Sequence, residues 1–97
     1  MSVRITCISK DGGNHENPHV AISDLGWIED GTGDTGRCSR VQMYDWIKHN
    51  NGHAYVRDGF GNAVRVGTAE TAHGTKYVRT YRDAVWTDNL LALPECV

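Results

Sequence analysis

The sequence contains few cysteines, no long apolar run and no excess of charge of either sign, and each absence argues against a class of protein. Its three cysteines, Cys7, Cys38 and Cys96, are too few for a disulfide framework, so we expect reduced thiols and a cytoplasmic location. We expect neither a signal peptide nor a membrane-spanning segment, because no apolar stretch is long enough for either. The net charge of -2 argues against binding of duplex DNA through bulk charge.

What is present suffices for one small folded domain. The chain has 97 residues, and we expect residues 1–97 to form a single domain. Hydrophobic residues make up only 39%, but three tryptophans, four tyrosines and one phenylalanine can anchor a modest core. The composition therefore excludes a globally disordered chain.

The first half of the chain predicts one strand and one clear helix. Alternation of apolar and polar residues predicts a strand over residues 2–9. We interpret residues 15–28 as a turn or short helix begun by Pro18, and residues 29–37 as a mobile surface loop. The clearest helix spans residues 39–50, because Ser39 and Gln42 have the spacing of a capping box and Asn50-Asn51-Gly52 can end the helix.

The second half predicts an antiparallel meander. Strands are expected at residues 54–57, 63–68 and 76–81. The tail should pack back onto the sheet through Trp86, Leu90, Leu91 and Leu93. We therefore predict a two-layer α+β fold, in which a mostly C-terminal β-meander and the N-terminal strand pack on one main helix at about residues 39–50.

Alternation along these strands also predicts a face rich in tyrosine and arginine. Residues 54–82 carry five cations and two anions, a net charge of +3 within a chain of -2. Such a face suits a protein partner, or a nucleotide or single-stranded nucleic acid. It is equally compatible with an ordinary solvated sheet surface. The candidate partner-binding residues are Tyr55, Arg57, Arg65, Tyr77, Arg79 and Tyr81.

A second hypothesis is a zinc site. His15 and His19 lie four residues apart, although Pro18 disfavours a helix between them. If the tail returns beside the first strand, Cys7 and Cys96 could converge with one or both histidines, and cysteine with histidine suits zinc. The alternative is that Cys7 is a small buried apolar residue. No cofactor other than zinc is indicated.

A third hypothesis is a catalytic cysteine–histidine pair. The residue types it needs are present, but no sequence pattern brings a base near a thiol.

Four segments resemble a known family over Ile5 to Cys96: ITCISKDGGNHENPHVAI, MYDWIKHNNGHAYVRDGFGN, KYVRTYRD and DNLLALPEC. They are similar to the small bacterial family known as domain of unknown function 3892. The resemblance implies a stand-alone bacterial or phage-borne domain with no catalytic residues to carry over. It implies that Cys7, His19 and Cys96 occupy positions of the family pattern, which favours the zinc hypothesis. The family's turn after the third strand is replaced here by Tyr81-Arg82-Asp83-Ala84.

The favoured function is a non-catalytic binding or regulatory module that uses the tyrosine- and arginine-rich face. A protein is the favoured partner, and a nucleotide or nucleic acid is the alternative. A homodimer is compatible with an exposed strand edge, and no membrane partner is expected. A structural zinc domain and a small enzyme of unknown chemistry are the competing functions.

Overall fold

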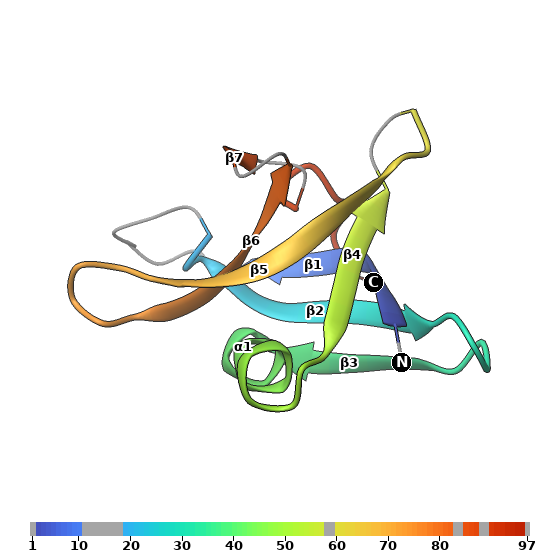
Figure 1. The fold of residues 1–97 in the computed structure, drawn as a ribbon, viewed down its shortest axis with the longest axis horizontal. Coiled ribbons are helices and arrows are strands. Elements are labelled where there is room, and N and C mark those ends of the chain that lie inside the picture. The colour runs from blue at the N-terminus through green and yellow to red at the C-terminus, as the bar shows by residue number, and fades with distance from the viewer. Residues whose placement is uncertain (1, 11–18, 58–59, 83–84, 88–89, 97) are drawn as a thin grey trace.

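A computed structural model describes residues 2–10, 19–57, 60–82, 85–87 and 90–96, which form one mixed sheet and one helix (Figure 1). The elements are β1 (Ser2–Lys10), β2 (Ile22–Glu29), β3 (Thr35–Ser39), α1 (Arg40–His49), β4 (His53–Arg57), β5 (Ala63–Glu70), β6 (Lys76–Arg82) and β7 (Val85–Thr87). The described strands make a seven-stranded sheet in the order β3-β2-β1-β4-β5-β6-β7. No helix in the described part of the chain is long and apolar enough to cross a membrane.

The expected N-terminal strand, central helix and C-terminal strands are all confirmed. At the start of α1, the Gln42 backbone N–H donates to Ser39 Oγ over 3.1 Å, and the Ser39 backbone N–H donates to Gln42 Oε1 over 2.8 Å. The capping box therefore forms as the sequence predicts. Asn51 has a φ of 53°, the left-handed conformation that commonly follows a helix.

Two expectations in the first half were wrong. In place of a helix or turn and a mobile loop, residues 22–29 and 35–39 are antiparallel strands, with Trp27 opposite Gly36. The expected turn at residues 15–18 lies outside the described residues. The β3 sequence TGRCS has little strand propensity by itself. In the hairpin the Trp27 indole covers Gly36, where a Cβ atom would lie only 2.7 Å from Trp27 Cε2.

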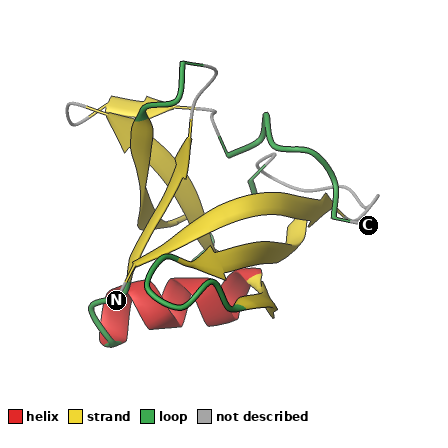
Figure 2. Cartoon of the chain, turned by 90° about the vertical axis from the view of Figure 1, so that its right-hand side faces the viewer, coloured by secondary structure: helices red, strands yellow, loops and turns green. Residues whose placement is uncertain are grey.

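The sheet is mixed rather than a simple meander, because β1 and β4 run parallel. They pair only at Ser2–His53, Val3–Ala54 and Arg4–Tyr55, and then separate. Further along β1, the C-terminal tail takes the vacated edge: the Ile8 backbone N–H donates to Pro94 O, and the Cys96 N–H donates to Ile8 O, each over 3.0 Å. The group β1-β2-β3 therefore lies across β4 and its neighbours rather than continuing in their plane (Figures 1 and 2).

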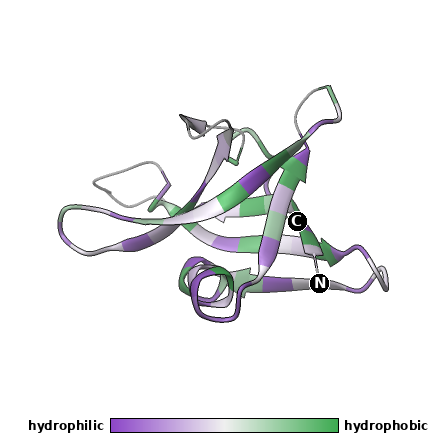
Figure 3. Ribbon diagram, in the orientation of Figure 1, coloured by the Kyte–Doolittle hydropathy of each residue, from purple (hydrophilic) through white to green (hydrophobic). Residues whose placement is uncertain are grey.

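The core fills the angle between these two groups of strands. Hydrophobic and hydrophilic residues alternate along β5 (Figure 3), so that one side of the strand can face this core. The helix contributes Met43 and Tyr44, and the tail contributes Leu90, which is completely buried as expected. The fully buried aliphatic residues of the core are Ile8, Ile22, Leu25, Val56, Val78 and Leu90.

Polar contacts hold the helix against both groups of strands. Arg40 Nε donates to Lys76 O over 2.9 Å, and Arg40 Nη1 donates to Val20 O, so the first turn of α1 joins the start of β6 to the residues before β2. One turn later, the Tyr44 hydroxyl donates to a Glu70 carboxylate oxygen over 2.8 Å. The helix position is therefore specified by directional contacts as well as by apolar packing.

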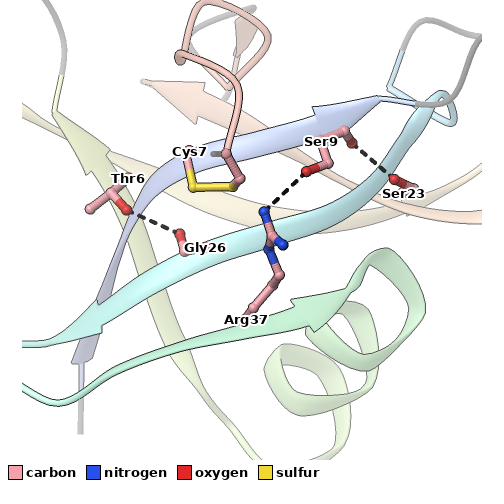
Figure 4. Close-up of a disulfide and its surroundings, with 7 residues drawn as sticks. Thr6, Cys7, Ser9, Ser23, Gly26 and Arg37 are labelled. Carbon is pink, nitrogen blue, oxygen red and sulfur yellow. Dashed lines mark hydrogen bonds between the residues drawn. A yellow bond between two sulfur atoms is a disulfide. The ribbon is translucent and has the colours of Figure 1, made fainter.

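A disulfide joins Cys7 of β1 to Cys96 of the tail, so the expectation of reduced thiols was wrong for these two residues. The pairing was not predictable from local pattern, because 89 positions separate the two cysteines. Gly26 lies opposite Cys7 on β2, and a Cβ atom there would clash with Cys7 Sγ (Figure 4). The missing side chain of Gly26 therefore makes the space that the bond occupies.

Substitution of Cys96 by serine should lower the free energy of unfolding by about 2–4 kcal/mol, because a long loop in the unfolded chain is no longer closed. Urea denaturation of Cys96→Ser and of the oxidised wild-type protein measures the difference. The reduced wild-type protein should unfold at nearly the same urea concentration as Cys96→Ser.

The matched control is Cys38→Ser, since Cys38 is a free thiol. Its stability should remain sensitive to reductant, like that of the wild-type protein. If reductant leaves the wild-type stability unchanged, the disulfide does not contribute as we expect.

Candidate functional site

A row of alternating cationic and aromatic residues crosses five strands of the sheet. The strand registers place Arg4 opposite Tyr55, Tyr55 opposite Arg65, Arg65 opposite Tyr81, and Tyr81 opposite Trp86. Residues directly opposite each other on adjacent strands share one face of a sheet. The predicted tyrosine and arginine residues therefore share one side of the sheet, and the same row extends to Arg4 on one side and to Trp86 on the other.

Tyr55 is a structural member of this row. Its side chain is only 9% exposed, and its hydroxyl donates to both carboxylate oxygens of Asp30, over 2.8 and 2.9 Å. Burial raises the pKa of Tyr55, and the Asp30 carboxylate raises it further. The Arg57 guanidinium lies 5.8 Å from the centre of the Tyr55 ring. Tyr55 therefore links the loop after β2 to β4 and is not available to stack on a ligand.

Three other predicted residues are also engaged within the protein. Tyr77 is 9% exposed, and its ring centre lies 6.0 Å from that of His19. Arg57 Nη1 donates to Gly61 O over 2.8 Å, and Arg79 Nε donates to Thr87 O over 3.1 Å. These arginines brace a hairpin and the β6–β7 pair. The structure thus places all six predicted residues on one face, but leaves Arg65 and Tyr81 as the members best placed to meet a partner.

Arg65 and Tyr81 border a groove with a volume of about 330 Å³. The Tyr81 and Trp86 rings meet edge to face, with centres 5.5 Å apart and planes at 73°. Both rings lie over Gly67, where a Cβ atom would be 2.7 Å from Tyr81 Cε1. We call this site the Arg65–Trp86 groove. Its lining residues are Ile47, Arg65, Val66, Gly67, Thr68, Tyr81 and Trp86.

Trp86 is the residue that sequence reasoning missed. We expected it to pack back onto the sheet with the leucines of the tail, but its side chain is 44% exposed on the short strand β7. Only the pairing of β7 with β6 places Trp86 beside Tyr81. A three-residue strand is too short to show alternation, so the sequence pattern does not predict β7. The only hint of a site here was a tryptophan, Trp86, that lies outside the predicted strands and helix.

Comparison with known proteins gives a family and no activity. The model of the family described as "Protein of unknown function (DUF3892)" matches residues 4–94. The chain belongs to this family. No curated protein and no solved structure matches the chain. A function for this DUF3892 protein can therefore be inferred only from the chemistry of its own side chains.

Of the residues predicted to bind zinc, the structure brings the two cysteines together. Cys7 and Cys96 do converge, but their sulfur atoms form a disulfide, and zinc is bound by thiolates. His19 is buried beside Tyr77, and His15 lies outside the described residues. Within the described ranges, no group of three histidine, cysteine or acidic residues is arranged to hold a metal. While the disulfide is formed, Cys7 and Cys96 cannot serve as the thiolate ligands of the predicted zinc site.

Cys38 is the remaining thiol, and its surroundings make it a poor nucleophile. It lies half-buried on β3. Burial raises its pKa from 9.0 to about 11, and the nearby Asp24 carboxylate adds to this shift. Reactive cysteines have lowered pKa values, because the thiolate is the attacking form. Cys38 is therefore a neutral thiol near pH 7.

The alkylation rate of Cys38 by iodoacetamide should reveal this raised pKa. Only the thiolate reacts, so the rate should rise about tenfold per pH unit and continue rising above pH 9, the ordinary value. Mass spectrometry of the oxidised protein measures modification of Cys38 alone. The same chain unfolded in urea should level off near pH 9, whereas a plateau near pH 9 in the folded protein would contradict the burial of this thiol.

Proposed function

We propose that the protein is a non-catalytic binding module that holds an acidic, extended protein segment at the Arg65–Trp86 groove. The observation that carries this proposal is the position of Arg65, an exposed cation directly opposite Tyr81 and next to the Tyr81–Trp86 pair. Arginine, tyrosine and tryptophan are the residues that most often dominate the energy of protein interfaces. Here they border a single groove.

The electrostatics of the groove favour a partner with carboxylates. The Arg65 guanidinium forms no hydrogen bond with any residue that the structure describes, so its donors are free for a bidentate contact. Residues 54–82 carry a net charge of +3. The Asp30 carboxylate, which lies on the same side, is already occupied by the Tyr55 hydroxyl. An acidic segment would therefore meet an unpaired cation without displacing an existing contact.

The geometry supports a protein segment over a nucleic acid. Proteins that bind single strands stack successive bases on several exposed aromatic rings, but Tyr55 and Tyr77 are buried. In addition, β7 pairs on one side with β6. In the described part of the chain its other side is a sheet edge, where an extended peptide can add backbone hydrogen bonds. Trp86 would then contact the side chains of that peptide.

A cytoplasmic location, as expected from the sequence, is part of this proposal. Disulfides are unusual in the cytosol of most organisms, because thiol reductants keep cysteines reduced. The oxidation state of Cys7 and Cys96 in cells, measured by rapid acid quenching and differential alkylation, therefore bears on the location. Complete oxidation in growing cells would argue for an oxidising compartment.

The proposal predicts that Arg65→Ala and Trp86→Ala each weaken binding of a glutamate-rich peptide by about tenfold or more, the effect expected of dominant interface residues. Fluorescence anisotropy with labelled peptides that alternate glutamate and valine measures the affinity. Added salt should also weaken binding, because it screens Arg65.

Arg37→Ala is the matched control, since it removes an exposed arginine from β3 at the opposite end of the strand order. It should bind the peptide within about twofold of the wild-type protein. Tight binding of oligothymidylate with no binding of the acidic peptides would replace the protein partner with a nucleic acid. Equal affinities for the wild-type protein, Arg65→Ala and Trp86→Ala would refute the groove as the site.

A further inference from the structure

A second cavity lies between α1 and the group β1-β2-β3. Its volume is about 350 Å³, and it shares no lining residue with the Arg65–Trp86 groove. We infer that this cavity, the Trp27–Trp46 pocket, binds an uncharged, planar aromatic small molecule against its two indole rings. The residues that line it are Val3, Trp27, Arg37, Cys38, Gln42, Met43 and Trp46.

Both tryptophans are held in place by glycines. Trp27 lies across Gly36, and a Cβ atom at Gly36 would be within 2.8 Å of three atoms of the indole. Trp46 lies across Gly52 in the turn after α1, and the Gly52 N–H donates to Trp46 O over 3.1 Å. A ring packed on backbone cannot turn without losing that contact. The two indoles therefore form preorganised walls, which lower the cost of ordering a site when a ligand binds.

Arg37 is the charged residue among those that line the pocket, and its side chain points away from the two indole rings. Arg37 lies opposite Gly26, whereas its neighbours Gly36 and Cys38 lie opposite Trp27 and Leu25. Alternation along β3 therefore puts Arg37 on the other face of the sheet. Arg37 Nη2 lies 3.5 Å from Ser9 Oγ, and Figure 4 shows the side chain crossing β2 beside the disulfide.

The remaining lining groups are neutral. Cys38 carries a raised pKa because it is buried, so its thiol is uncharged at neutral pH. Met43 adds a polarisable thioether, which makes favourable contacts with aromatic rings. A charged ligand would lose its hydration here without gaining a partner of opposite charge. The pocket chemistry therefore selects for an uncharged aromatic compound.

Gln42 adds one directional preference. Its Oε1 atom accepts the Ser39 backbone N–H in the capping box, so the carbonyl of this amide is already used. Its amino group is the part that can still donate to a ligand. The volume lies at the small end of the range for ligand pockets, roughly 300–1,000 Å³. These features suit a compact aromatic ring system that carries a hydrogen-bond acceptor.

The probe for this proposal is N-phenylnaphthylamine, an uncharged aromatic fluorophore. Titration into the full-length oxidised protein should raise the probe fluorescence and quench tryptophan emission with saturation at a single site. Its sulfonated analogue, anilinonaphthalene sulfonate, should bind about tenfold more weakly or not at all, because the sulfonate adds a charge that the pocket cannot pair. Equal affinity for the two probes would overturn the assignment of an uncharged ligand.

The three tryptophans provide matched variants. Trp27→Ala and Trp46→Ala should each weaken binding of N-phenylnaphthylamine by about tenfold, the usual effect of losing a stacking ring. Trp86→Ala removes an exposed tryptophan from the separate groove and should leave the affinity unchanged. Cys38→Phe should fill the pocket and abolish binding. Circular dichroism reports whether each variant is folded.

A second measurement needs no variant. Because Cys38 lines the pocket and is the free thiol, a bound ligand should shield it. Saturating N-phenylnaphthylamine should slow alkylation of Cys38 by about tenfold or more, as expected if most molecules carry the ligand. An unchanged alkylation rate, or loss of probe binding in Trp86→Ala equal to that in Trp27→Ala, would overturn the proposal. The acidic-peptide titration tests the other groove, so the two proposals can fail separately.

Discussion

One edge of β1 pairs first with β4 and then with the C-terminal tail, and the rest of the structure depends on this change of neighbour. Residues 2–4 of this edge pair in parallel with β4, and Ile8 pairs with the C-terminal tail. Because β4 leaves β1 after three pairs, the two groups of strands can enclose a core that a flat sheet would leave open to water. The Cys7–Cys96 bond then holds the tail where the strands separate.

The two candidate sites depend on this arrangement of strands and on glycines that leave room for bulky side chains. In several places a bulky group occupies the space above a residue without a Cβ atom, which fixes its position through packing rather than hydrogen bonds. The pairs are the disulfide with Gly26, Trp27 with Gly36, Trp46 with Gly52, and Tyr81 with Gly67. The second and third form the walls of the pocket beside α1, and the fourth forms one wall of the Arg65–Trp86 groove.

The groups around the two candidate sites differ in charge. Two cysteines are joined in a disulfide, and the third is a neutral thiol at physiological pH because burial raises its pKa. On the tyrosine-rich face, Arg57 and Arg79 donate to backbone carbonyls, whereas Arg65 is exposed beside the groove. The two proposals therefore assign ligands of different character to the groove and to the pocket.

The sequence by itself determined the elements whose signals are local. The capping box at Ser39 and Gln42 and the alternation of β4, β5 and β6 depend on neighbours a few positions away, so the helix, those strands and the shared face of Tyr55, Arg65 and Tyr81 were predictable. Only the tertiary structure decided the β2–β3 hairpin, the disulfide and the exposure of Trp86. Each depends on a distant partner: Gly36 accommodates Trp27, 89 positions separate the bonded cysteines, and β7 takes its place from β6. Local propensity is too small to specify such contacts, which form only when the whole core is assembled.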